Sequence, residues 1–169
     1  SGNYRRKLGI SDEAAGRITY IGKNRKEEFS AGGRPLTVET LASTDEGVAF
    51  VLEYEGKRLY HAGDLNWWTW IGETEAEYED MTGRFKAEME KLRGRHFDAA
   101  FVPLDPRQEE RYFWGFDYFM RGTDTDLAFP MHFWGDFSVI GRLLADPVSE
   151  PYRERVQRIR EKGEGWQLP

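Results

Sequence analysis

The first third of the chain alternates short apolar runs with turn residues, the pattern typical of antiparallel β-strands. It predicts strands at Ile18 to Ile21, Glu27 to Ser30, Leu36 to Leu41, Val48 to Tyr54 and Arg58 to His61. The pair Glu55-Gly56 separates the last two runs, and a two-residue connection of this kind indicates a tight hairpin. We therefore expect an antiparallel meander that is entered from a short N-terminal helix.

Helical and strand patterns alternate over the rest of the chain. Apolar residues fall three and four apart between Thr74 and Arg93, which predicts an amphipathic helix that Gly94 ends. The later runs predict a strand from Ala99 to Leu104, a helix from Glu109 to Met120, a strand from Leu127 to Met131 and a helix from about Phe137 to Leu144 with Asp136 as its N-cap. The tail, Glu150 to Leu168, suggests a short helix and then a strand near Arg158. The predicted fold class is α/β (α+β), in a single domain over residues 1–169.

Metal-ligand side chains follow two of the predicted strands where each strand ends. His61-Ala62-Gly63-Asp64 closes the first strand, and His132 closes the second. Asp105 follows a third strand, so the three strand ends share one sheet edge if the strands are neighbours. Binding sites form at such edges, and histidine and carboxylate are zinc ligands. The pattern predicts a candidate metal site.

Each of these residues also has a plainer explanation. Gly-Asp is a common turn after a strand, which would account for Asp64, and Asp105 fits the turn that begins a helix. His132 lies among apolar residues and could be a half-buried histidine bonded to backbone. His61, three residues before Asp64, is either a donor that supports the site or a structural residue. His96 is expected on the surface.

Four segments resemble the metallo-β-lactamase superfamily of metal-dependent hydrolases. They are Ser43 to Phe50, Gly63 to Trp68, Phe101 to Arg107 and Phe129 to Trp134. In that family a strand closing in Gly-Asp supplies a metal-bridging aspartate, and a later strand supplies the last histidine. The resemblance makes Asp64 and His132 the catalytic residues and metal ligands. His61, which stands three residues before Asp64, is a further candidate ligand. It also implies a partial αββα sandwich in which one or two ions of zinc or another divalent metal activate a water for hydrolysis.

The chain departs from the family pattern in two places. The family's first metal motif, HxHxDH, is absent from a chain with three histidines. Ser43, Thr44 and Asp45 stand where many members have another histidine. Asp45 or a hydroxyl could replace it as an oxygen ligand, but a turn explains the same residues. Because zinc sites use three or four protein ligands, we expect an incomplete and inactive C-terminal portion that by itself is metal-free or binds metal weakly.

Composition narrows the expected partners. The 169 residues carry a net charge of -6 and no cysteine, which excludes thiolate ligands. Acidic and basic residues are interspersed, which disfavours nucleic-acid binding, and no apolar run approaches the roughly 20 residues of a membrane span. We expect a cytoplasmic location, a small-molecule substrate and no membrane partner.

Aromatic residues make up 15% of the chain, and Trp67-Trp68-Thr69-Trp70 directly follows Asp64. These rings would form either a wall for a ring-bearing substrate or packing of the core. Phe113, Trp114, Phe116, Phe119 and Trp134 are expected to meet them, or to await a missing N-terminal half or a second copy of the chain.

Three functions stay open from the sequence. The first is a metallo-hydrolase in its full-length form. The second is a non-catalytic binding or assembly module that has lost the metal site. The third is a sandwich rebuilt by two chains or by a separate partner. The residues do not select a substrate.

Overall fold

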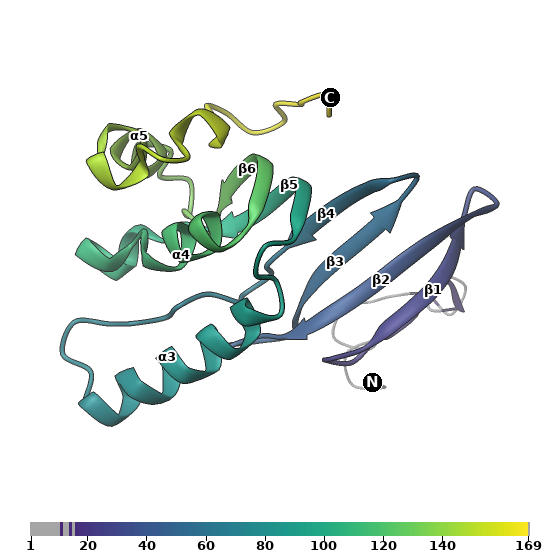
Figure 1. Ribbon diagram of the computed structural model, residues 1–169, viewed down its shortest axis with the longest axis horizontal. Helices are drawn as coiled ribbons and strands as arrows, with labels where there is room; N and C mark the ends of the chain where they lie inside the picture. The colour runs from purple at the N-terminus through teal and green to yellow at the C-terminus, as the bar shows by residue number, and fades with distance from the viewer. Residues whose placement is uncertain (1–10, 12–13, 15, 169) are drawn as a thin grey trace.

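The computed structural model describes residues 11, 14 and 16–168 and contains one six-stranded sheet whose spatial order follows the chain order (Figure 1). The strands are β1 (Lys26–Ala31), β2 (Arg34–Ala42), β3 (Val48–Tyr54), β4 (Lys57–His61), β5 (His96–Pro103) and β6 (Asp124–Met131). The first four pair antiparallel, whereas β4 with β5 and β5 with β6 pair parallel. The sheet is therefore mixed, and with its helices the chain has the predicted α/β (α+β) fold class.

The β3–β4 hairpin shows why the predicted meander forms. Glu55 and Gly56 both have positive φ, 49° and 79°, which is the conformation of the two central residues of a type I′ turn. This turn matches the twist of the flanking strands and sets the register that pairs Tyr54 with Lys57. The strand from Val48 to Tyr54 has the predicted bounds.

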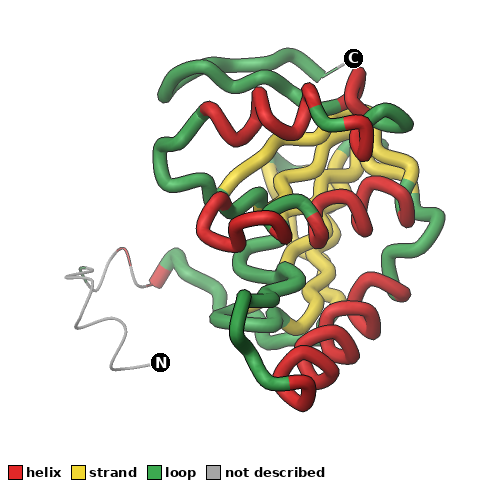
Figure 2. The backbone as a smooth tube through the Cα atoms, turned by 90° about the vertical axis from the view of Figure 1, so that its left-hand side faces the viewer, coloured by secondary structure: helices red, strands yellow, loops and turns green. Residues whose placement is uncertain are grey.

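The helices cover one face of this sheet, in front of the strands in Figure 2. They are α3 (Glu75–Glu90), α4 (Trp114–Gly122) and α5 (Ser138–Ala145), with 3-10 turns η1 (Pro106–Arg111), η2 (Pro147–Ser149) and η3 (Arg153–Arg155). Thr74 begins α3 with a capping box that includes Glu77. No helix in the described part of the chain is long and apolar enough to cross a membrane.

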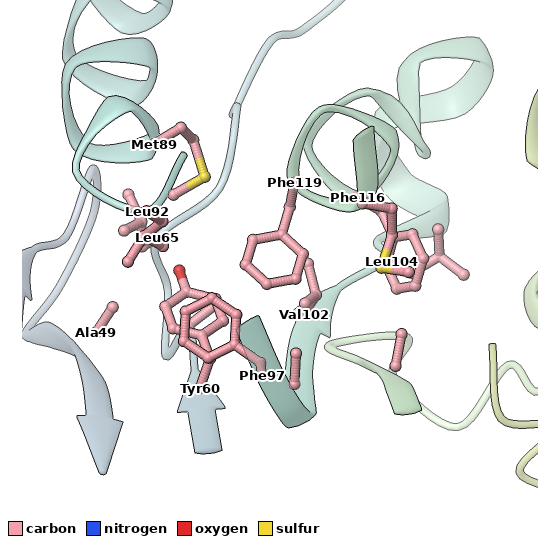
Figure 3. Packing of buried hydrophobic residues seen from close by; sticks show 14 of the residues in the cluster. Ala49, Tyr60, Leu65, Met89, Leu92, Phe97, Val102, Leu104, Phe116 and Phe119 are labelled. Atoms are coloured by element: carbon pink, nitrogen blue, oxygen red, sulfur yellow. The ribbon is translucent and has the colours of Figure 1, made fainter. Parts of the chain in front are cut away.

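The core lies between the helices and the sheet (Figure 3). The ring of Tyr60, on β4, stacks on Phe119 of α4 with ring centroids 4.8 Å apart, and Phe97 lies 5.6 Å from Tyr60. All three side chains are buried. Burying a ring of this size stabilises the fold by roughly 1.5–3 kcal/mol, so this contact fixes α4 against β4 and β5.

The opposite face of the sheet carries an apolar groove. It is lined by alternate residues of the parallel strands, among them Leu59, Phe101 and Phe129, and has a volume of about 830 Å³. The C-terminal tail borders the groove, and Trp166 meets Phe129 edge-on at 5.1 Å. Helices thus cover one face of the sheet, so the described part of the chain forms two layers, one of helices and one sheet.

Three sequence-based predictions of elements differ from the structure. Residues 18–21 form no strand, and the side chains of Ile18 and Tyr20 are exposed. The helix predicted over residues 109–120 begins later, as α4 at Trp114, because residues 106–111 form η1, in which Glu109 has the non-helical φ 56° and ψ -114°. The tail forms the 3-10 turn η3 and a single bridge between Ala128 and Val156 instead of a strand. The expected N-terminal helix lies largely outside the described residues.

Candidate metal centre

The structure brings the three strand-end residues together. Because β4, β5 and β6 are parallel neighbours, their carboxyl ends meet at one edge of the sheet. Oδ2 of Asp105 lies 2.8 Å from Nδ1 of His132, and Oδ1 of Asp64 lies 3.5 Å from Nε2 of the same ring. Each nitrogen of His132 therefore faces a different carboxylate.

Asp105 determines the proton position on His132. Its side chain is fully buried. Burial alone would raise the pKa of this carboxyl, but hydrogen bonds from Arg107, His132 and Trp134 hold the pKa below its usual value. An ionised carboxylate only accepts hydrogen bonds, so Nδ1 of His132 donates to Asp105. In the neutral ring, Nε2 then presents its lone pair to Asp64.

The contact between Nε2 and Asp64 fits a shared cation. Two electron-pair donors 3.5 Å apart repel each other unless a proton or metal ion lies between them. Nitrogen and oxygen ligands of a tetrahedral zinc, each at roughly 2.0–2.2 Å, are about 3.4 Å apart. His132 and Asp64 therefore match two positions of such a site, whereas zinc sites use three or four protein ligands.

Arg107 is the residue that sequence reasoning missed. Its Nε and Nη2 donate hydrogen bonds to the Asp105 carboxylate at 2.5–3.0 Å, and its backbone N–H donates to the same group at 2.9 Å. This N–H bond is the cap of η1, so the predicted turn at Asp105 is present. The sequence signal was the Asp-Pro-Arg order, but only the fold shows that the same carboxylate also contacts His132.

The backbone is strained at the end of β6. His132 and Trp134 have φ of 67° and 53°, a region that residues with side chains rarely adopt. The His132 ring packs against Trp68 at 5.1 Å, and Trp134 meets it edge-on at 5.5 Å. These contacts and the bond to Asp105 hold the ring in place despite the strained backbone.

A buried polar network fixes the loop that carries Asp64. The hydroxyl of Thr44 donates to the Asn66 carbonyl at 2.6 Å and accepts from the Asn66 N–H at 3.1 Å. Asn66 also donates to Gln108 at 2.9 Å, and Gln108 donates to the carbonyl of Trp67 at 2.8 Å. The loop after β2, the loop after β4 and η1 are thereby tied into one rigid unit.

Residues 43–45 form a turn, in which the N–H of Asp45 donates to the hydroxyl of Ser43 at 3.1 Å. Thr44 is committed to the network with Asn66. Asp45 borders the same hollow as His132, so its role as an oxygen ligand stays a prediction.

Gly63 is required for the approach of Asp64 to the site. Its φ is +56°, and a Cβ at this position would lie 2.8 Å from the carbonyl oxygen of Val48. A residue with a side chain would therefore displace the start of the loop from β3.

His61 lies beside the site on the uncovered face of the sheet. Its Nδ1 accepts the N–H of Gly63 at 3.1 Å, and its ring stacks on Phe101 at 5.6 Å. Burial lowers the pKa of His61, although the charge of Asp64 opposes this effect. In this tautomer Nε2 carries the proton, so metal binding through Nε2 would require the proton to move to Nδ1, which would break the hydrogen bond from Gly63. Its role as a ligand stays a prediction.

The tryptophans that follow Asp64 divide between core and site. Trp67 packs on Phe85 at 5.7 Å, and Trp68 lies behind His132. Trp70 is 41% exposed at the mouth of a hollow of about 280 Å³. The hollow is lined by Thr44, Asp45, Trp68, Trp70, Met81, Arg107 and His132. Of the other rings expected to meet this loop, Trp114 packs on Trp67 with ring centroids 5.5 Å apart. Phe116 and Phe119 belong to the core, and Trp134 contacts His132.

A second group of ligand atoms lies at the opposite end of the parallel strands. Atoms of His96, Asp98 and Asp126 lie within 4.8 Å of one another. The ammonium of Lys57 lies 3.0 Å from Asp98, and the N–H of Arg58 donates to that carboxylate at 2.7 Å. Because a cation already neutralises Asp98, we assign no metal here. His96 is exposed, as the sequence predicted.

Comparisons with known proteins give two partial similarities to solved structures. No family model matches the chain, and no curated protein matches it. It is similar to the Zn(2+)-bound PqqB from Methylobacterium extorquens, with 18% identity, a TM-score of 0.37, and coverage of 68% of this chain and 40% of that one. It is also similar to a putative Zn-dependent hydrolase of the metallo-β-lactamase superfamily from Thermotoga maritima, with 16% identity, a TM-score of 0.31, and coverage of 75% and 57%. The chain thus spans less than two thirds of the length of each of these proteins.

Proposed function

We propose that this chain forms part of a metal-dependent hydrolase that uses a metal-activated water. One observation carries the proposal, the His132 ring with Nδ1 bonded to Asp105 and Nε2 facing Asp64. A carboxylate behind a histidine is the usual support of a metal-binding imidazole, because it fixes the tautomer and orients the ring. Asp64 and His132 are the proposed ligands, and Asp105 is the residue that orients His132.

The protein groups have separate tasks in this proposal. A divalent ion held by Asp64 and His132 would lower the pKa of a bound water, which is the chemistry that hydrolysis of a carbonyl or phosphoryl centre needs. Asp105, held by Arg107, keeps the proton on Nδ1 of His132 and leaves Nε2 free to bind. Trp68 covers the His132 ring from behind, which excludes water from that side.

Two ligands bind zinc weakly, so the complete site needs further ligands from a longer protein or from another chain. The chain by itself is therefore expected to be inactive. This expectation sets the choice of experiment, because metal binding can be measured where turnover cannot.

The test is a zinc titration that is monitored by NMR through the ring resonances of the three histidines. We expect zinc to shift His132 first, and Asp64→Asn or His132→Ala to remove this binding. His96→Ala, in the second cluster, is the matched control and is expected to leave it unchanged. Zinc that leaves the His132 resonances unshifted, or binding lost only in His96→Ala, would show that the assignment is wrong.

A binding module without catalysis is the second candidate, and the apolar groove favours it. The groove of about 830 Å³ is lined mainly by apolar residues such as Phe101, Phe129 and Met131. Such a module would bind an apolar dye equally with and without a chelator. A dye affinity that depends on zinc would oppose this candidate.

A further inference from the structure

Two exposed tryptophans border the candidate centre in fixed positions. Trp134 is 70% exposed, yet its indole N–H donates to buried Asp105 at 3.3 Å. Trp70 is 41% exposed and stacks on Trp68 with ring centroids 6.1 Å apart and planes inclined by 6°. Large exposed aromatic side chains in a folded protein indicate a binding site, particularly where other contacts hold the rings in place.

Arg107 lies between these two rings. The centre of its guanidinium is 4.7 Å from the Trp134 ring and 6.0 Å from the Trp70 ring, within the range of cation–π contacts. Its Nε and Nη2 bind Asp105, whereas Nη1 donates to no acceptor among the described residues. The planar guanidinium is therefore immobilised with one donor edge unused.

Arg107 also lines the hollow that contains His132. The hollow of about 280 Å³ is bordered by Trp70, Arg107 and His132, and its size suits a ligand with one ring. Asp45 also borders it, so a cationic ligand is the competing class. A ligand that spans the hollow would reach Nε2 of His132 at one end and the indole of Trp70 at the other.

We propose that Trp70, Arg107 and Trp134 form the recognition subsite for a substrate with a flat, unsaturated ring and an oxyanion, either a carboxylate or a phosphate. The ring stacks on Trp70 and the oxyanion accepts from Nη1 of Arg107. Selective binding needs both the ring and the oxyanion of the ligand. Stacking on Trp70 alone accepts many different rings, and the charge of Arg107 is already neutralised in part by Asp105. The substrate role rests on the proposed hydrolase, whereas binding at the subsite needs no metal.

The experiment compares the affinities of four small probes for the metal-free chain. Binding is monitored by NMR through the indole N–H resonances of the tryptophans. Benzoate has the ring and the carboxylate, cyclohexanecarboxylate lacks the flat ring, benzyl alcohol lacks the charge, and benzylamine reverses it. We expect benzoate to bind at least about tenfold more tightly than each of the other three, with the largest shifts at Trp70 and Trp134. Phenyl phosphate in place of benzoate separates a phosphate preference from a carboxylate preference.

Variants assign the binding to the subsite. Arg107→Lys keeps the positive charge but loses the planar set of guanidinium donors, and it is expected to weaken benzoate binding about tenfold. Trp70→Leu is expected to remove the preference for benzoate over cyclohexanecarboxylate. Trp166→Leu, in the apolar groove, is the matched control and leaves both affinities unchanged. Because Arg107→Lys could disturb Asp105, Trp134→Leu provides a second variant in which Arg107 is intact.

Several results would overturn the subsite. Benzylamine binding most tightly would assign the hollow to a cation beside Asp45, and a loss in Trp166→Leu alone would move the ligand to the apolar groove. Equal affinities for all four probes would also contradict it. The subsite and the hydrolase fail separately, since benzoate binding without zinc binding leaves only the subsite, and zinc binding at His132 without benzoate preference leaves only the hydrolase.

Discussion

Oδ2 of Asp105 lies 2.8 Å from Nδ1 of His132, across 27 residues of sequence, and this bond joins the ends of β5 and β6. Asp105 serves two purposes at once, since it also caps η1 through the N–H of Arg107. The carboxylate of Asp105 thus both caps the turn that the sequence predicts and orients the ring of His132. A change at Asp105 is expected to affect the histidine before it affects the rest of the fold.

Asp105→Asn is expected to lower zinc affinity by about 10–100-fold, because an amide no longer fixes the proton of His132 on Nδ1. The zinc titration of the histidine resonances measures this change. Asp124→Asn, an exposed carboxylate beside His96, is the matched control. An affinity equal to that of the wild type would show that Asp105 does not orient a ligand.

Gly115→Ala is expected to destabilise the fold by about 1–3 kcal/mol, since a Cβ there would collide with the Asn66 side chain and break its buried network. Unfolding in urea measures the free energy. Gly141→Ala is the control, because it lies in α5 with nothing within 4 Å of its Cβ. That change is expected to stabilise the protein by about 0.5–1 kcal/mol, and equal effects of the two changes would contradict the argument.

The tryptophans after Asp64 are expected to differ sharply in their effect on stability. Trp67 packs on Phe85 and donates to the hydroxyl of Thr82 at 2.9 Å, so Trp67→Ala is expected to cost on the order of 3 kcal/mol. Trp70→Ala is expected to change stability by less than about 0.5 kcal/mol, since the ring is at the surface. Thermal and urea unfolding of both variants would test the division. Comparable losses would place Trp70 in the core.

Asp98 predicts a dependence of stability on pH. Burial would raise its pKa, but the N–H of Arg58 and the ammonium of Lys57 outweigh burial and lower it. A lowered folded-state pKa adds stability that is complete above the unfolded value, about 3.9, and is lost as the pH falls through the lower folded value. Wild type and Asp98→Asn should therefore differ at pH 6 and converge in acid. The control Asp126→Asn, with an exposed carboxylate, is expected to show a smaller difference at pH 6.

Local pattern predicted those elements whose neighbours are close in sequence. The strand at Val48 to Tyr54 and the helix that became α3 follow from alternation, a hairpin turn and a capping box, all of which act within a few residues. The strand predicted at residues 18–21 is absent because a strand needs a partner, which apolar character alone does not provide. The break at Glu109 had no local signal of comparable strength.

The sequence alone determined which residue types stand at the strand ends, and so identified Asp64, Asp105 and His132 as one candidate edge. Only the tertiary structure decided their roles. The parallel register of β5 with β6 places Asp105 behind His132, and Asp64 in front of it. The tertiary structure also decides that Trp67 packs against the core and that Trp70 lies at the mouth of the hollow beside His132. These outcomes depend on contacts between residues far apart in the chain, and no local propensity encodes such contacts.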